Sequence, residues 1–467
     1  MRFLPRGLTR SLAATGVAGA WLVAAGAAWA ADVPRAEECL ACHGDKDLKR
    51  GTPAPGRPDS LFVDVEAIKG SAHGRLECVA CHKTATAPHE PLPRVRCASC
   101  HDKARAALGE GVHGVRKELA GAPAPTCTSC HGTHAVRHAA TLTIDACATC
   151  HPSQVRGYRD SVHGKSRGRG DSEAATCRSC HGAAHGLLAK SDPRAPTYHL
   201  SLPRACAACH ADPELAKRHN ITVGNVYQLY MDSIHGRAVS KSDLLVAANC
   251  SDCHGAHEIK PRTDRTSRVF RANVPATCGA CHAGVHTEYA QSVHGQAAAK
   301  GDARAPVCTD CHSAHQIRRT EAAPWQLDVI RECGTCHTES LRTYRDTFHG
   351  KVTTLGFTRA AKCADCHGSH AIQPASDPRS RVSAMNILAT CRQCHTEATW
   401  KFTEFHPHAD PANKARFPKL YYSWLFMTAL LIGTFSFFGL HTLLWLPRSL
   451  VDRLRRERAR RGRTPER

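Results

Sequence analysis

The sequence is poor in the residues that normally build a protein interior. Only 26 of its 467 residues are Phe, Trp or Tyr, and branched aliphatic side chains are few. Much of the 42% apolar content is Ala and Cys. These small side chains bury little surface each. An ordinary globular enzyme is thereby excluded, and we expect something other than side chains to fill the core.

The sequence also lacks cysteine that could form disulfides or act in catalysis. All 26 Cys fall into thirteen C-x-x-C-H strings, with none left over. The strings consist of Cys39, Cys42 and His43; Cys78, Cys81 and His82; Cys97, Cys100 and His101; Cys127, Cys130 and His131; Cys147, Cys150 and His151; Cys177, Cys180 and His181; Cys206, Cys209 and His210; Cys250, Cys253 and His254; Cys278, Cys281 and His282; Cys308, Cys311 and His312; Cys333, Cys336 and His337; Cys363, Cys366 and His367; and Cys391, Cys394 and His395.

This spacing predicts covalently attached haem c. Two thiols three residues apart on a helical turn reach the two vinyl groups of one porphyrin, and the adjacent His binds the iron. Zinc ribbons and disulfide frameworks do not demand a His at the fifth position of every string. We therefore predict thirteen haem c groups, each with its own proximal histidine.

Both ends of the chain carry targeting signals. Residues 1–30 combine Arg2, Arg6 and Arg10 with an apolar run and an A-x-A site, without a twin-arginine pair, and predict a secretory signal peptide. An uncleaved anchor is the alternative. Residues 420–446 contain no charged side chain and are long enough to span a membrane as a helix. The basic tail at 447–467 favours a cytoplasmic C-terminus and a periplasmic domain at 31–419.

The net charge of +21 does not indicate a nucleic-acid partner. The two ends account for nine of these charges, which leaves +12 for residues 31–447. A ferric haem with two ionised propionates carries about −1, so thirteen haems offset that excess. We interpret the Lys and Arg excess as counter-charge for propionates, and the tail as a topology signal or a contact to anionic lipid.

Nineteen His lie outside the haem strings, and most follow two patterns. One set sits in Ser-x-His-Gly or a near variant, and a second set trails closely behind a haem string. The first set is His73, His113, His163, His235, His294 and His349, and the second is His89, His134, His185, His257, His315 and His370. In four cases a Tyr precedes the first-set His by five residues.

These patterns define six two-haem repeats between about residue 71 and residue 395, with the string at 39–43 outside the scheme. The repeats start their haem strings at Cys78 and Cys97, Cys127 and Cys147, Cys177 and Cys206, Cys250 and Cys278, Cys308 and Cys333, and Cys363 and Cys391. Both sets are candidate distal ligands, and so are His406 and His408. A trailing His three residues past a proximal His has about 10 Å of extended chain, too little to reach the opposite face of the same iron. We expect it to serve a neighbouring haem.

The doubled strings with Ser-x-His-Gly and C-H-G-x-H resemble multihaem c-type cytochromes of the periplasm, particularly the tetrahaem and octahaem group that includes tetrathionate and hydroxylamine reductases. The resemblance covers residues 39 to about 408. It implies mostly bis-histidine, low-potential haems stacked in a chain. The implied fold is mainly α with extensive coil and few or no strands, to which this chain adds one C-terminal transmembrane helix. Catalytic members keep one iron open or lysine-ligated, whereas no C-x-x-C-K occurs here.

The sequence thus favours an electron-transfer protein rather than an enzyme, and we assign no catalytic residue. The expected location is the bacterial inner membrane, with one span and the haem domain in the periplasm. Expected partners are a cytochrome b-like or other integral quinone-reactive subunit, periplasmic or outer-membrane redox proteins, and the membrane itself. His441, in the apolar helix, is a candidate for b-type haem or quinone contact. The alternatives are a multihaem reductase of a small nitrogen or sulfur oxyanion and a haem-bearing scaffold or sensor.

Overall fold

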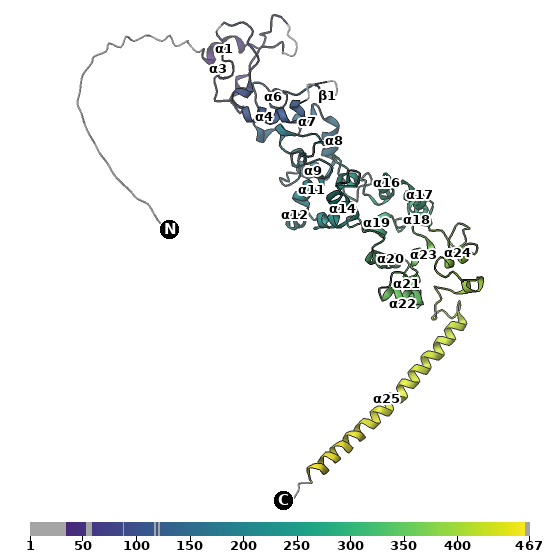
Figure 1. The fold of residues 1–467 in the computed structure, drawn as a ribbon. Coiled ribbons are helices and arrows are strands. Elements are labelled where there is room, and N and C mark those ends of the chain that lie inside the picture. Colours follow the sequence, from purple (N-terminus) through teal and green to yellow (C-terminus); the bar gives the residue numbers. More distant parts are fainter. Residues whose placement is uncertain (1–33, 53–57, 87, 116–117, 120–121, 463–467) are drawn as a thin grey trace, which may run out of the picture. The chain divides into compact units, whose positions relative to one another are not determined.

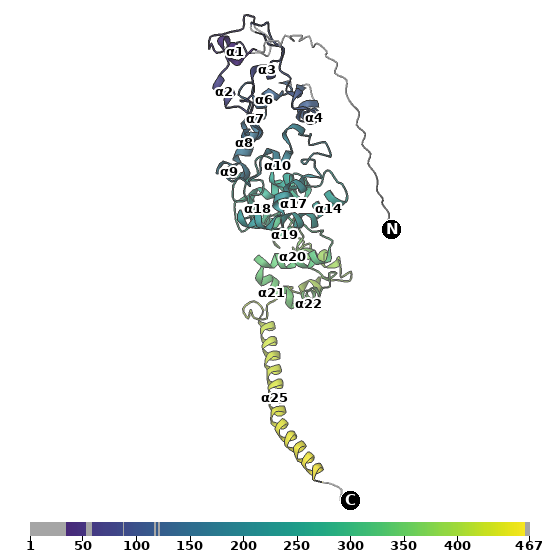
Figure 2. The ribbon, with the colours of Figure 1, turned by 90° about the vertical axis from the view of Figure 1, so that its left-hand side faces the viewer.

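The computed structural model describes residues 34–52, 58–86, 88–115, 118–119 and 122–462 (Figure 1). The predicted signal peptide at 1–30 lies outside these residues. Short helices joined by coil make up most of the described chain, and one long helix, α25, ends it (Figure 2). The prediction of a mainly α fold with extensive coil is confirmed.

The helices rarely exceed three turns. The α-helices are α1 (Ala36–His43), α2 (Val65–Lys69), α3 (Cys78–Cys81), α4 (Asp102–Glu110), α5 (Val112–Val115), α6 (Cys127–His131), α7 (Asp145–Ala148), α8 (Pro152–Asp160), α9 (Val162–Gly168), α10 (Cys177–His181), α11 (Leu202–His210), α12 (Pro213–Arg218), α13 (Val226–Asp232), α14 (Ile234–Lys241), α15 (Cys250–His254), α16 (Val274–Gly279), α17 (Ala283–Gln291), α18 (Val293–Ala299), α19 (Cys308–His312), α20 (Ala323–Cys336), α21 (Thr338–Asp346), α22 (Phe348–Thr354), α23 (Cys363–His367), α24 (Ile387–Arg392) and α25 (Pro418–Arg461). The 3₁₀ helices are η1 (Cys97–Ser99), η2 (Ala139–Thr141), η3 (Ala184–Gly186), η4 (Arg271–Asn273) and η5 (Trp400–Glu404).

The described strands are minimal, as expected. Strand β1 (Glu118–Leu119) pairs antiparallel with β2 (Ala122–Pro123), with Glu118 opposite Pro123. An isolated bridge joins Lys49 to Ser60. A sheet therefore contributes nothing to the core of the described residues.

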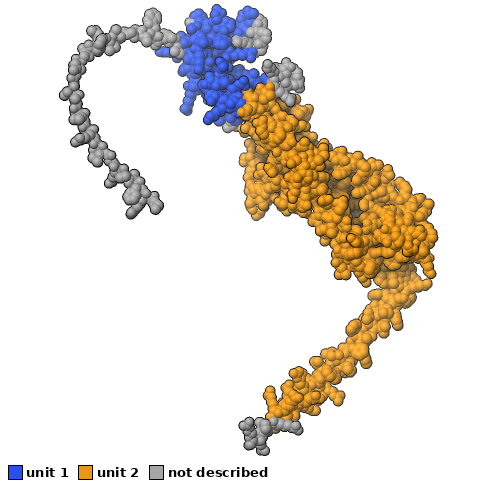
Figure 3. All heavy atoms as spheres, in the orientation of Figure 1, with its two compact units in different colours: residues 1–107, 117–146 blue, residues 108–116, 147–467 orange. Residues whose placement is uncertain are grey.

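The chain forms two compact units (Figure 3). Unit 1 comprises residues up to 107 together with 117–146, and unit 2 comprises residues 108–116 together with 147–467. Unit 1 contains the first four haem strings and unit 2 the other nine.

The apolar core of the described residues is very small. Twelve apolar residues are buried, of which six are Ala, and all lie in unit 2. They are Val155, Ala195, Ala216, Val239, Ala247, Val274, Ala305, Val307, Ile330, Tyr344, Ala360 and Ala398. Such small side chains cannot stabilise a unit of this size alone, as the sequence predicted.

Helix α25 is longer than the predicted span. It begins at Pro418, passes through Pro447 without ending, and extends to Arg461. It is the one described helix long and apolar enough to cross a membrane, with mean hydropathy 1.7 over its best window. Its 44 residues measure about 66 Å at 1.5 Å per residue, roughly twice a hydrocarbon core. The basic segment after residue 446 therefore continues the helix, because Arg and Leu are good helix formers.

Candidate haem-binding sites

In the second to sixth repeats, the first haem string forms a five-residue helix whose third residue accepts a hydrogen bond from the amide just before the string. In α15 the side chain of Asn249 accepts a hydrogen bond from the Ser251 amide, and the Asp252 carboxylate accepts one from the Asn249 amide. Gly255 then ends the helix at φ +80°. This left-handed conformation costs glycine little and turns the chain abruptly behind the proximal His. Gly132, Gly182 and Gly368 end α6, α10 and α23 in the same way.

The Ser-x-His-Gly motif forms the start of a second kind of helix. In α18 the Ser292 hydroxyl donates to the Tyr289 carbonyl at 2.7 Å and accepts from the Gly295 amide at 3.1 Å, which caps the helix. Ser292 is fully buried. A Cβ on Gly295 would collide with the Tyr289 carbonyl, so this position requires glycine. The motif therefore fixes the backbone on both sides of His294.

The first-set histidines each face the proximal His of the second haem string in the same repeat. The ring centroids lie 5.8–6.2 Å apart in all six cases. The pairs are His73 with His101, His113 with His151, His163 with His210, His235 with His282, His294 with His337, and His349 with His395.

Four trailing histidines face the first proximal His of the preceding repeat. The pairs are His134 with His82, His257 with His181, His315 with His254, and His370 with His312, at 6.1–6.3 Å. His89 faces His43 of the first string at 5.8 Å. His408 takes the corresponding place for the last repeat and lies 6.2 Å from His367. In each of these pairs, the His outside the strings faces a proximal His of a string that does not directly precede it in the chain.

These separations match two imidazoles that share one metal ion. An imidazole nitrogen binds a metal at about 2.0 Å and lies about 1.1 Å from its ring centre, so two opposite imidazoles have centroids about 6.2 Å apart. The twelve pairs fall between 5.8 and 6.3 Å. The residues present therefore fit a c-type haem with a histidine on each face.

His131 ends α6, and its Nδ1 lies 3.1 Å from the Arg137 carbonyl oxygen. His185 lies in η3. Of the two juxtamembrane candidates, His406 packs against Phe417 at 6.0 Å between ring centroids, while His408 pairs with His367. The structure thus separates two histidines that the sequence offered as equivalent.

In the first five repeats, a backbone hydrogen bond joins the segment that carries the first-set His to the segment behind a trailing His of the next repeat. The residue before the first-set His donates its amide to a carbonyl two residues past a trailing His of the next repeat, and this recurs five times at 2.7–2.9 Å. The pairs are Ala72 with Val136, Val112 with Leu187, Val162 with Ile259, Ile234 with Ile317, and Val293 with Ile372. Successive repeats therefore interlock.

The paired imidazoles are electrostatically suited to bind iron, which requires neutral nitrogen. Burial lowers the pKa of fourteen of them, and in most a neighbouring imidazole lowers it further. These are His82, His113, His134, His163, His181, His210, His235, His254, His294, His312, His315, His349, His367 and His408.

Several rings are also oriented by hydrogen bonds at the nitrogen that iron does not need. His43 Nδ1 lies 2.7 Å from the Leu61 carbonyl, and His89 Nδ1 lies 2.9 Å from that of Glu90. His408 Nδ1 lies 3.1 Å from the Thr343 hydroxyl, which donates to a carbonyl of its own helix and so accepts from the ring. These contacts select the tautomer that leaves Nε2 available.

Consecutive haem strings lie beside one another within each unit. In unit 1, Cys39 is within hydrogen-bonding reach of Cys78, as Cys97 is of Cys127, and Cys81 lies near Cys97. In unit 2 the same holds for every consecutive pair of the nine strings. The neighbours are Cys147 and Cys177, Cys180 and Cys206, Cys206 and Cys250, Cys253 and Cys278, Cys278 and Cys308, Cys311 and Cys333, Cys333 and Cys363, and Cys366 and Cys391. Each unit therefore holds an unbroken series of attachment sites.

The pairs fall into two groups by the angle between their ring planes. The first-set pairs are tilted by 37–58°, and the pairs His82 with His134 and His367 with His408 are tilted by 46° and 36°. The other four pairs, at His43, His181, His254 and His312, are nearly parallel, at 8–22°. Because parallel imidazoles split the iron dπ orbitals more than tilted ones, we expect two groups of low-spin ferric signals. Electron paramagnetic resonance of the oxidised protein at low temperature measures this, and a single uniform signal would contradict the geometry.

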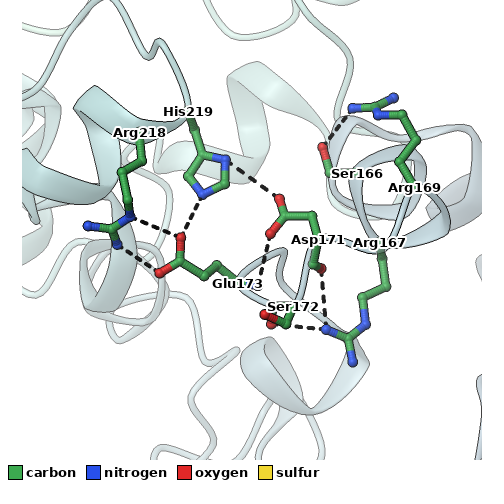
Figure 4. Close-up of polar contacts among 8 residues, drawn as sticks. All are labelled: Ser166, Arg167, Arg169, Asp171, Ser172, Glu173, Arg218 and His219. Carbon is green, nitrogen blue, oxygen red and sulfur yellow. Dashed lines mark hydrogen bonds and ion pairs between the residues drawn. The ribbon is translucent and has the colours of Figure 1, made fainter.

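Two other histidines contact protein groups instead of a second histidine. His199 Nε2 lies 2.8 Å from the Ala247 carbonyl, and its Nδ1 lies 3.1 Å from the Asn249 side chain, so both nitrogens are engaged. His219 lies between the carboxylates of Asp171 and Glu173, and Arg218 also pairs with Glu173 (Figure 4). The Arg218 guanidinium lowers the pKa of Glu173. This ion-pair cluster joins the end of α12 to the loop after α9.

Two further contacts support the paired histidines, and no sequence motif marks the residues that make them. The Trp325 indole stacks on the His312 ring at 5.4 Å and 9°. Arg342 forms an ion pair with Asp410 at 2.6 Å, and Asp410 is buried. The second contact holds the segment that carries His408. The acidic residue two positions after His408 was visible in the sequence, but its partner was not.

Comparison with known proteins gives one match. Residues 169–323 are similar to domains II/IV of outer membrane cytochromes of the MtrC/MtrF-like family. No curated protein and no solved structure matches the chain. The match supports a multihaem c-type cytochrome that functions in electron transfer, and the 26 cysteines fit covalently bound haem c. The matched family and the apolar helix α25 also support an association with membranes.

Proposed function

We propose that this chain is a membrane-anchored, thirteen-haem cytochrome c that carries electrons between the membrane quinone pool and periplasmic or extracellular acceptors. The observation that carries the proposal is the combination of paired histidines at one-iron separation with consecutive attachment sites that adjoin each other. Haem c bound at these sites supplies one-electron redox chemistry. A site with a histidine on both faces has no position for substrate, which favours electron transfer over catalysis.

In this mechanism, the role of the polypeptide is to position the haems and their histidine ligands. The cysteine pairs would attach each haem to its helix, and the paired histidines would bind its iron. Hydrogen bonds at Nδ1 orient the rings of His43 and His408. The backbone bonds between repeats join the first-set segments of the first five repeats to the repeat that follows. Because the groups are held rigidly, little reorganisation accompanies a change in charge.

The membrane end is proposed as the place where electrons enter or leave. His408 lies ten residues before α25 begins, and its partner His367 belongs to the last repeat. A single helix cannot build a complete quinone pocket, so the proposal includes an integral cytochrome b-like or other quinone-reactive partner. The family match supports redox partners in the periplasm or outer membrane at the other end of the pathway. We place the haem domain in the periplasm and the basic end of α25 in the cytoplasm of an inner-membrane protein.

The test uses the full-length protein in its own membranes. Reduced quinone is expected to reduce the c-type haem bands, and a soluble ferric chelate is expected to reoxidise them. The pyridine haemochrome of the purified protein should give thirteen haems per chain. Haem bands that stay oxidised with quinol but reduce with dithionite would contradict the quinone link. A high-spin ferric signal displaced by nitrite or hydroxylamine would instead indicate a reductase.

A further inference from the structure

Four tyrosines, one in each of the third to sixth repeats, contact both the helix of a first-set His and the start of a haem string. Tyr158, Tyr230, Tyr289 and Tyr344 each precede a first-set His by five residues. Each donates its hydroxyl to a backbone carbonyl 17 or 18 residues further along, at 2.8–3.0 Å. The four acceptors, Ala175, Ala248, Pro306 and Ala361, all lie two residues before the first Cys of a haem string.

The acceptor carbonyl belongs to the peptide group that begins an attachment helix. In the fifth repeat, Tyr289 bonds to the Pro306 carbonyl, while the amide of the same peptide, on Val307, donates to the Asp310 carboxylate at 2.6 Å. Both the carbonyl and the amide of this peptide group are therefore hydrogen-bonded. The same arrangement recurs at Thr176 with Ser179, Asn249 with Asp252, and Lys362 with Asp365.

The other end of each tyrosine is tied to the distal histidine. The carbonyl of Tyr289 accepts from the Ser292 hydroxyl and lies against Gly295, and Ser292 caps the helix that carries His294. The equivalent serine bonds are 2.6 Å long at Tyr158 and Tyr230, and Thr347 makes the same bond to Tyr344. One residue thus touches both the cap of a distal-His helix and the start of a haem-attachment helix.

We propose that Tyr158, Tyr230, Tyr289 and Tyr344 are positioning residues, which we call the tyrosine relay, that fix the distal imidazole of the second haem relative to the first haem of the same repeat. The inference rests on the proposed function, because it takes the paired histidines as axial ligands. The relay belongs to the third to sixth repeats. In the first two, Ile68 and Leu108 occupy the equivalent position and have no hydroxyl to donate.

Burial supports this role. Desolvation raises the pKa of all four tyrosines, so each hydroxyl keeps its proton and remains a donor. Tyr344 is 7% exposed and belongs to the small apolar core. Loss of one hydroxyl leaves a carbonyl unpaired and frees the distal helix to shift relative to the attachment helix.

The chain offers a matched control, because it has eight tyrosines and four lie outside the relay. The relay variant replaces Tyr158, Tyr230, Tyr289 and Tyr344 by Phe, and the control variant replaces Tyr198, Tyr227, Tyr421 and Tyr422 by Phe. Each is compared with the wild-type holoprotein by low-temperature electron paramagnetic resonance, by redox titration and by thermal unfolding.

In the relay variant, low-spin lines from four of the thirteen sites, about a third of the low-spin intensity, are expected to shift or broaden. The control variant should match the wild type in its spectrum. A relay variant with unchanged spectrum and potentials overturns the relay, even if its unfolding temperature falls, because a merely structural role would lower stability alone. If the relay variant does not accumulate, the single change Tyr289→Phe gives the same comparison for one site. A wild type without low-spin signals overturns the proposed function instead.

Discussion

Replacing His408 by alanine is expected to convert one haem of the full-length protein from low spin to high spin. His408 lies 6.2 Å from His367 between ring centroids, and the Thr343 hydroxyl orients its ring. Removal of this imidazole leaves the iron of the last repeat's first site with a single axial ligand, which changes both its spin state and its potential. Since about 59 mV changes a one-electron equilibrium tenfold, we expect quinol-driven reduction of the other haems to slow by about tenfold or more.

The matched control is His406→Ala, two residues away in the same juxtamembrane segment. The ring contact of His406 among the described residues is with Phe417, so this variant should keep every site low spin. Added imidazole should restore the low-spin signal of the His408→Ala protein, because it can occupy the vacated position. Equal spectra for the two variants, or a high-spin signal in the His406 variant alone, would contradict the assignment of His408.

Without haem attachment, the chain from residue 34 to residue 410 is expected not to fold. The buried apolar side chains number only twelve among the described residues, and half are Ala. Such a core cannot offset the conformational entropy of the ordered backbone, so the porphyrins must supply most of the apolar contact. The measurement is limited proteolysis and far-ultraviolet circular dichroism of chain produced without cytochrome c maturation.

The expected outcome is complete digestion under conditions in which the holoprotein resists. A milder comparison replaces Cys308 and Cys311 by Ala, which removes one attachment site and leaves the other strings intact. This variant should lose one haem per chain and unfold at a lower temperature, while still forming a folded product. A compact, protease-resistant chain that lacks haem would show that side chains alone make a sufficient core.

The sequence predicts the haem attachment sites because C-x-x-C-H needs only five adjacent residues. The mainly α fold with extensive coil was implied by the resemblance that the doubled strings carry, and the structure confirms it. The sequence also predicted that a trailing His serves a neighbouring haem, since the chain is too short to do otherwise.

The sequence could not predict which haem each distal His serves, because long-range contacts decide this. His408 is placed by Thr343, 65 residues earlier, and by the ion pair of Arg342 with Asp410. The constant spacing from each tyrosine to its first-set His was visible in the sequence. The hydrogen-bond partners of the tyrosines could not be predicted, because they are backbone carbonyls of Ala or Pro residues. Helix α25 was predicted to end near residue 446, whereas good helix formers carry it through Pro447 to Arg461. Charge marked the end of the apolar stretch and not the end of the helix.

The direction in which the trailing histidines reach has a consequence for how the molecule can change in size. The fourth and fifth repeats each supply one imidazole to the repeat before and receive one from the repeat after, as His257 and His315 show at the sites of His181 and His254. Duplication or loss of such a whole repeat would therefore keep the number of distal imidazoles equal to the number of irons that need one, provided that His89 and His408 still serve the first and last sites. The same scheme could lengthen or shorten the conducting path two irons at a time, whereas adding half a repeat would leave a ligand short.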